Sequence, residues 1–182
     1  MRLKLKLIPL KIIICIAFFV SCTDNLNFDE IDLNVDPIVT VPLINFELDQ
    51  DDFFNSPSGT EIPTITDISD FRVFESSDIR NEIIKTVFDF EIENRFDRSF
   101  EVNVVFFDGN DNITQIIPAL NIVSEDLDYV ATYSVEIENS PTFLSSRKVS
   151  VEVKLIPSSS QIDPNIYQTI KFRSTGTFHF SI

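Results

Sequence analysis

The sequence predicts an all-β protein, an antiparallel β-sandwich of about seven to nine strands with immunoglobulin-like architecture. From Ile38 onward, apolar and polar residues alternate with a period of two, and clusters of Pro, Asn, Asp and Ser separate these runs. No long stretch has the spacing of an amphipathic helix. The chain has 18 Phe and no Trp, so Phe side chains are expected to fill the core.

The clearest strand is 148–155, where apolar residues at odd positions alternate with polar and charged residues, as in a strand with one buried face. The same alternation predicts strands at 39–48, 71–74, 88–93, 100–106, 113–117, 129–137 and 170–182. Gly176 lies on the apolar face of the last strand, which predicts a bulge or bend there. Helix is expected only as short turns at 51–55 and 77–84.

The first 21 residues are typical of a lipoprotein signal peptide. Four basic residues accompany an apolar run at 12–20 that is shorter than the roughly 20 residues needed to span a bilayer. Residues Phe19, Val20 and Ser21 before Cys22 resemble a lipobox. The resemblance implies that the lipoprotein signal peptidase recognises these three residues and that Cys22 carries the lipid. Ser21 has the required small size, whereas Phe19 departs from the usual Leu or Val. An ordinary secretory signal or an uncleaved anchor is the alternative.

This interpretation divides the chain into three parts: a signal peptide at 1–21, a lipidated N-terminus and acidic tether at 22–37, and a β-sandwich domain at 38–182. All four basic residues before Cys22 and none of the acidic ones lie in the first part. Its removal leaves 161 residues with 10 basic and 29 acidic side chains, a net charge of −19. This charge opposes nucleic-acid binding. Cys15 and Cys22 are used by processing, so no disulfide supports the domain.

One acidic cluster has the alternate oxygen ligands of a calcium loop. Asp108, Asn110 and Asn112 are its weak metal-ligand candidates, but the glycine lies second, and the twelfth position holds Ala119, where a bidentate Glu would be needed. Two apolar runs flank the cluster, and Asp-Gly favours a hairpin. We therefore predict a hairpin turn and no metal.

Residues for catalysis are sparse, and neither an active site nor a cofactor is predicted. His179 is the only histidine, and no Gly-x-Ser-x-Gly elbow accompanies it, so we expect a solvated residue on the last strand. A carboxylate pair of the glycosidase type stays open, because 29 acids offer many pairs.

Three tyrosines could contact a sugar by stacking. Tyr129 and Tyr133 share the apolar face of their strand, which indicates packing on the core with the hydroxyl at the rim. Tyr167 follows Pro164 in a polar loop and is the weak candidate for an exposed binding contact.

Two stretches resemble known proteins. Residues 38–45, with the sequence Ile-Val-Thr-Val-Pro-Leu-Ile-Asn, resemble the opening of small outer-membrane lipoproteins of Bacteroidota. Residues 88–109, which end in Phe-Phe-Asp-Gly, resemble a later segment of those lipoproteins and are also similar to late-embryogenesis-abundant type two sandwiches. The resemblance implies an immunoglobulin-like sandwich in the cell envelope, and it supplies no catalytic residue.

Together these features predict a non-catalytic, lipid-anchored protein of the outer membrane, on its periplasmic face or at the cell surface. We expect a binding or scaffolding module, an accessory subunit of an outer-membrane assembly with an envelope protein as partner. A surface glycan-binding lipoprotein is the alternative, and a hydrolase that uses a carboxylate pair is the second alternative.

Overall fold

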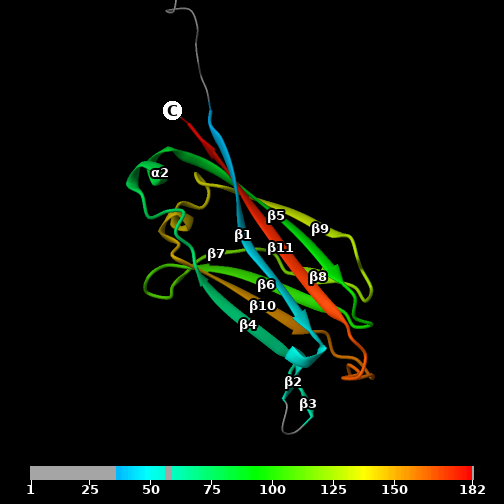
Figure 1. The fold of residues 1–182 in the computed structure, drawn as a ribbon. Coiled ribbons are helices and arrows are strands. Elements are labelled where there is room, and N and C mark those ends of the chain that lie inside the picture. Colours follow the sequence, from blue (N-terminus) through cyan, green and yellow to red (C-terminus); the bar gives the residue numbers. More distant parts are fainter. Residues whose placement is uncertain (1–35, 56–58, 182) are drawn as a thin grey trace, which may run out of the picture. The chain divides into compact units, whose positions relative to one another are not determined.

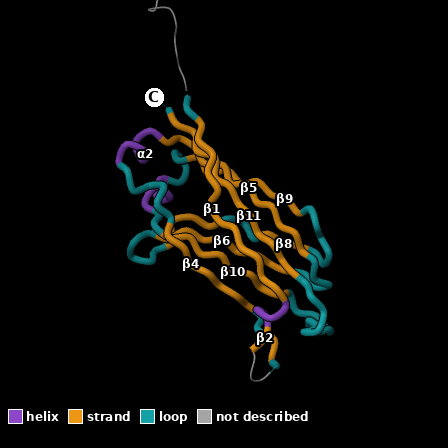
Figure 2. The backbone as a smooth tube through the Cα atoms, viewed as in Figure 1, coloured by secondary structure: helices purple, strands orange, loops and turns teal. Residues whose placement is uncertain are grey.

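The computed structural model describes residues 36–55 and 59–181. In this part of the chain a four-stranded and a five-stranded antiparallel sheet pack around one core, and a separate two-stranded hairpin extends from one end (Figures 1 and 2). The predicted all-β sandwich is confirmed. No helix among the described residues is long and apolar enough to cross a membrane.

The first sheet has the order β1-β11-β5-β9. Its strands are β1 (Ile38–Asp49), β11 (Thr169–Phe180), β5 (Ile83–Asn94) and β9 (Tyr129–Glu136). Successive side chains of a strand point to opposite faces of the sheet, which explains the burial pattern of β5. Phe88, Phe90 and Ile92 face the core, and Glu91 between the last two is exposed. The predicted strands at 39–48, 88–93, 129–137 and 170–182 all lie in this sheet.

The second sheet has the order β4-β10-β6-β7, and β8 also pairs with β6. Its strands are β4 (Thr64–Asp70), β10 (Lys148–Leu155), β6 (Phe100–Phe107), β7 (Ile113–Ile116) and β8 (Leu120–Ile122). The hairpin consists of β2 (Phe54–Asn55) and β3 (Thr60–Glu61). Helical turns are η2 (Gln50–Phe53), α2 (Ser77–Glu82) and η3 (Pro141–Ser145), the first two close to the predicted positions.

The predicted strand at 71–74 is wrong. The Phe71 N–H donates to the Arg147 carbonyl oxygen (2.7 Å), after which the chain leaves the sheet beside β10 as a loop. Phe71 and Phe74 are both buried and their rings meet edge to face, with centroids 5.3 Å apart. Two buried side chains three positions apart cannot lie on one face of a strand, whose side chains alternate.

The bulge predicted at Gly176 lies on the neighbouring strand. The register of β1 shifts between Pro42 and Ile44, whereas Gly176 itself pairs regularly with Val41 of β1 and Phe88 of β5. A Cβ at Gly176 would lie 2.9 Å from Leu43 Cδ1 and 3.1 Å from the Phe178 ring. Glycine therefore leaves room for the Leu43 side chain, which would have to shift if a Cβ were added.

Gly176→Ala is expected to lower the free energy of unfolding by about 1–3 kcal/mol, because the added methyl group overpacks this contact. Urea denaturation of the full chain measures the loss. Gly109→Ala is the matched control, since a Cβ there meets nothing within 4 Å. In a Leu43→Ala background the cost of Gly176→Ala should shrink, and an undiminished cost would contradict the steric explanation.

Candidate functional site

One end of the sandwich brings together three loops and a hairpin, and we call it the loop end. It comprises the β5–β6 turn at 95–99, the β8–β9 loop at 123–128, the β10–β11 loop at 156–168 and the β2–β3 hairpin (Figure 1). The chain enters the domain at the other end, because Ile38 pairs with His179 while Asp49, at the far end of β1, pairs with Thr169. The loop end is therefore separated from Ile38 by the full length of β1.

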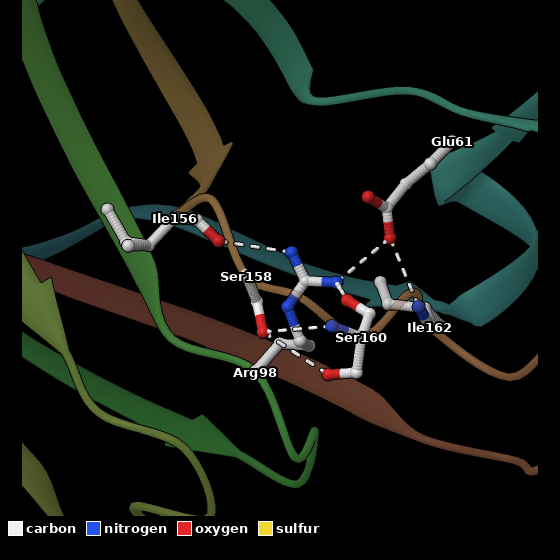
Figure 3. A network of polar contacts seen from close by, with 6 residues as sticks. All are labelled: Glu61, Arg98, Ile156, Ser158, Ser160 and Ile162. Atoms are coloured by element: carbon white, nitrogen blue, oxygen red, sulfur yellow. Dashed lines mark hydrogen bonds and ion pairs between the residues drawn. The ribbon is translucent and has the colours of Figure 1, made fainter.

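A buried arginine links the loops of this end. The Arg98 side chain is 3% exposed, and its Nη1 donates to Glu61 Oε1 (3.1 Å) and to the Ser160 carbonyl oxygen (2.6 Å). Its Nη2 donates to the Ile156 carbonyl oxygen (3.0 Å). Figure 3 shows the guanidinium between the carboxylate of β3 and these loop carbonyls. One side chain thus connects the β5–β6 turn, the hairpin and the β10–β11 loop.

Two more buried residues, Ile162 and Asn94, complete this network around Arg98, which we call the clamp. Glu61 Oε1 also accepts from the Ile162 N–H (3.1 Å), and the Ile162 side chain is itself buried. The amide of the buried Asn94 donates to the Arg98 carbonyl oxygen (2.8 Å) and to the Val123 carbonyl oxygen (2.7 Å), while its Oδ1 accepts from the Phe96 N–H (3.0 Å). Asn94 therefore fixes the backbone that carries Arg98 and ties it to the β8–β9 loop.

Apolar side chains lie exposed on the loops that the clamp holds. Tyr167 is 73% exposed in the β10–β11 loop, as the polar sequence around it predicted, and Val130 is 74% exposed where β9 begins. Ile166, Val123 and Leu127 are also exposed on these loops. Exposed large apolar side chains on loops held by a rigid scaffold are typical of a contact surface.

The outer face of the first sheet is charged and runs up to the loop end. Arg173 of β11 faces Glu91 of β5 at 4.0 Å, and both line a hollow of about 270 Å³ together with Leu127, Asp128 and Val130. Other charges on this face form similar cross-strand pairs, such as Lys171 with Glu47 at 3.5 Å. Exposed pairs of this kind contribute little stability, and they leave the face well solvated.

The other tyrosines and the histidine lie on strands. Tyr129 and Tyr133 are half-buried against the core, as predicted, and burial raises the pKa of the Tyr129 hydroxyl. The Tyr133 hydroxyl accepts from Gln115 Nε2 at 3.3 Å, at the rim of the sandwich. His179 is half-buried on β11 opposite Lys85.

The cluster at 108–112 forms the hairpin turn between β6 and β7. Asp108 Oδ1 accepts from the N–H groups of Asn110 (2.8 Å) and Asn112 (2.9 Å), and Oδ2 accepts from the Asn112 side-chain amide (3.0 Å). Asp111 takes a left-handed conformation with φ of 64° and pairs with Lys148 at 2.7 Å. Both oxygens of Asp108 are therefore engaged by donors of its own loop. No group of three His, Cys, Asp or Glu within the described ranges is placed to hold a metal ion.

The Asp108 turn predicts a pH dependence of stability. Hydrogen bonds from the Asn112 side chain and from loop N–H groups lower the pKa of Asp108 below its ordinary value of 3.8. Because the folded pKa is the lower one, the contribution is complete above the ordinary pKa and is lost as the pH falls through the folded pKa. Asp108→Asn should therefore lower the urea midpoint at pH 7, and its difference from the unmodified protein should shrink as the pH falls below 3.8.

Asp128→Asn is the control for this prediction. Asp128 is exposed, and no hydrogen bond to its carboxylate occurs in the described part of the chain. The control variant should follow the unmodified protein over the whole pH range. A difference between Asp108→Asn and the unmodified protein that does not shrink at all as the pH falls below 3.8 would contradict a role for the carboxylate.

The predicted lipid-attachment residues lie outside the described residues. These are Phe19, Val20, Ser21 and Cys22, so the predictions of a signal peptide and an anchor stay predictions. Sequence reasoning missed Arg98, Glu61 and Asn94, which organise the loop end.

No protein-family model matches the chain, and no curated protein matches it. Among solved structures it is similar to a candidate secreted protein of Parabacteroides distasonis, with 13% identity and a TM-score of 0.46, over 63% of this chain and 38% of the other. It is also similar to the structure of infectious bursal disease virus Gt strain, with 9% identity and a TM-score of 0.46, over 81% of this chain and 34% of the other. A third is the enzymatically active domain of bacteriophage CBA120 tailspike protein 4, with 9% identity and a TM-score of 0.41, over 79% and 19%.

In each comparison this chain spans less than two-fifths of the length of the other protein. At these TM-scores and identities the likenesses transfer neither a function nor a site residue to this chain. The resemblance to lipoproteins of Bacteroidota accordingly stays an expectation.

Proposed function

We propose that this protein is a lipid-anchored lipoprotein of the outer membrane, on the periplasmic face or at the cell surface, that acts as a non-catalytic binding or scaffolding module. In this proposal Cys22 carries the anchor, residues 22–37 form the tether, and the loop end contacts an envelope protein. The protein would be an accessory subunit of an outer-membrane assembly.

The observation that carries this proposal is the rigid support under the exposed apolar residues of the loop end. Arg98 and Asn94 fix three loops by bonds to backbone carbonyls, which lowers the entropy that those loops would lose when they bind. The surface also lies at the far end of β1 from the point where the chain enters the domain. A tether that ends at Ile38 would leave this surface free to face a partner.

The anchoring part is supported by Cys22 and the residues before it. Cys22→Ser should move the protein from the membrane fraction to the soluble fraction of the cells that produce it. Retention of this variant in the membrane fraction would contradict lipid anchoring. It would not contradict the loop-end contact, which a separate experiment tests.

Photo-crosslinking in intact cells tests the loop-end contact. A photoreactive amino acid at Tyr167 should yield one dominant cross-link to an envelope protein, and the same group at the exposed Ser134 of β9 should not. Cross-links of equal pattern at the two positions, or a soluble small molecule as the main product at Tyr167, would contradict the proposal.

The exposure of Tyr167 also favours a surface glycan-binding function as the second candidate. Aromatic faces stack on sugar rings, and Tyr167 is the tyrosine that the structure leaves accessible, since Tyr129 and Tyr133 pack on the core. A glycan array probed with the full chain and with Tyr167→Ala distinguishes the candidates. Glycan signals lost in the variant would support this function, and their absence from both would exclude it.

A further inference from the structure

We infer that the free edge of β4 is a docking site for an extended strand of a partner protein, with a basic side chain that pairs with Asp67 and apolar side chains two positions to either side. This surface is separate from the loop end, and the inference does not depend on the function proposed above.

The first support is the direction of the β4 backbone groups. At the two ends of β4, the Phe71 N–H donates to the Arg147 carbonyl (2.7 Å), and the Pro63 carbonyl accepts from the Leu155 N–H (2.8 Å). Along an antiparallel strand, the backbone N–H and C=O groups of successive residues point alternately to the neighbour on one side and on the other. The backbone groups of the odd-numbered residues of β4 therefore bond to β10. The N–H and C=O groups of Thr66 and Ile68 therefore point to the open side, where a further strand can bind them.

The second support is an apolar hollow beside this edge. The register pairs Ile65, Asp67 and Ser69 with the buried valines of β10, so these three side chains face the interior side of the sheet. Asp67 lines a hollow of about 150 Å³ with the following apolar residues: Phe46, Leu48, Ile65, Val151 and Val153. A second hollow of about 200 Å³ lies next to the first, between β1 and the end of β4; we call this line between the two edge strands the seam. A strand added to β4 would place its inward side chains over these hollows.

Asp67 determines the chemistry of the occupant. Its carboxylate stands at an apolar hollow, and no ion pair joins it to another residue in the described ranges. An inward-facing charge on an edge strand disfavours neutral and acidic strands, because it would be covered without a partner. A Lys or Arg opposite Asp67 would neutralise it and lay its aliphatic stem along the hollow.

The same residue disfavours a second copy of this chain. Asp67 is the middle residue of β4, so a symmetric antiparallel pairing centred there would place two carboxylates directly opposite each other. The net charge of the chain, −15, adds to the repulsion between copies. On the other exposed edge of this seam, Pro42 and the bulge after it interrupt β1, so β4 is the edge suited to strand addition.

The binding test uses the full chain in mild detergent and two synthetic peptides, Thr-Val-Thr-Lys-Thr-Val-Thr and the same peptide with Glu in place of Lys. Fluorescence anisotropy should show about tenfold tighter binding of the Lys peptide, since the cross-strand charge pair is attractive in one case and repulsive in the other. Asp67→Lys should reverse this preference. Equal binding of the two peptides, or binding of neither, would overturn the inference.

Backbone pairing is tested separately. Ile68→Pro removes an N–H that faces the open side and leaves the ladder to β10 intact, so it should abolish binding of the Lys peptide, whereas Ile68→Thr should retain it. N-methylation of the peptide removes the same bonds from the other partner and keeps the test valid if the proline variant unfolds. Undiminished binding of the N-methylated peptide would overturn strand addition. A dimer detected by sedimentation velocity and lost in Ile68→Pro would assign the edge to a second copy and overturn the proposed occupant.

Discussion

Arg98→Ala is expected to lower the free energy of unfolding by about 3–5 kcal/mol, because it removes one partner of a buried ion pair. The side chain of Arg98 is 3% exposed and that of Glu61 is 20% exposed, so little water can replace the guanidinium. The variant would also leave the carbonyl oxygens of Ser160 and Ile156 without the donors that they have in the structure. Chemical denaturation of the full chain, followed by circular dichroism, measures this loss.

Arg95→Ala is the matched control, since Arg95 belongs to the same turn but its side chain is 58% exposed. Its pair with Glu93 is a surface ion pair, so the control should lose less than about 1 kcal/mol. The loss in free energy of unfolding for Arg98→Lys should lie between those of Arg98→Ala and Arg95→Ala. A lysine retains the charge but lacks the planar guanidinium that reaches several acceptors.

The Arg98 prediction has a local signature as well. Amide hydrogen exchange should become faster in Arg98→Ala at Ile162, whose N–H donates to Glu61, and across the β10–β11 loop. Unchanged exchange there, with a stability within about 1 kcal/mol of the unmodified protein, would contradict the clamp. If Arg98→Ala abolishes the cross-link at Tyr167 while the circular dichroism signal of the β-sheets remains, the clamp is needed for the proposed loop-end contact.

Most of the fold could be predicted because both sheets have one buried face, and the alternation of Val149, Val151 and Val153 in β10 shows this directly. The edge strand β4 could not be predicted in this way. Its inward side chains are Ile65, Asp67 and Ser69, so its two faces differ little in polarity. Edge strands that must avoid aggregation often have such mixed faces.

The candidate site was predictable only where its contacts are local. The Asp108 turn is held by residues within four positions, and Asp-Gly between two apolar runs is sufficient to predict it. The Arg98 clamp joins residues 37, 58 and 62 positions apart. In the sequence Asp97, Arg98 and Ser99 have the composition of a solvated turn, and nothing in the sequence distinguishes an arginine that bends back into the protein from one that faces water.

Phe143→Ala is expected to cost about 3–5 kcal/mol, the usual range for the loss of a buried aromatic ring. Phe143 is fully buried although it lies on η3, outside both sheets. Its ring centroid lies 4.9 Å from that of Phe74, 5.2 Å from Phe106, 5.8 Å from Phe88 and 6.1 Å from Phe71. The ring therefore joins β5, β6 and the loop after β4, and its removal would leave a cavity bounded by four rings.

Leu144→Ala is the control for Phe143, because Leu144 is the next residue of η3 and is only half-buried against the same core. Urea denaturation should show a clearly smaller loss for this control, and Phe143→Leu should retain part of the packing. A loss for Phe143→Ala no larger than that for Leu144→Ala would contradict the central place of the ring. The large expected cost follows from the cavity between four rings, and since the domain is expected to have no disulfide, no cross-link adds to the stability that these Phe contacts supply.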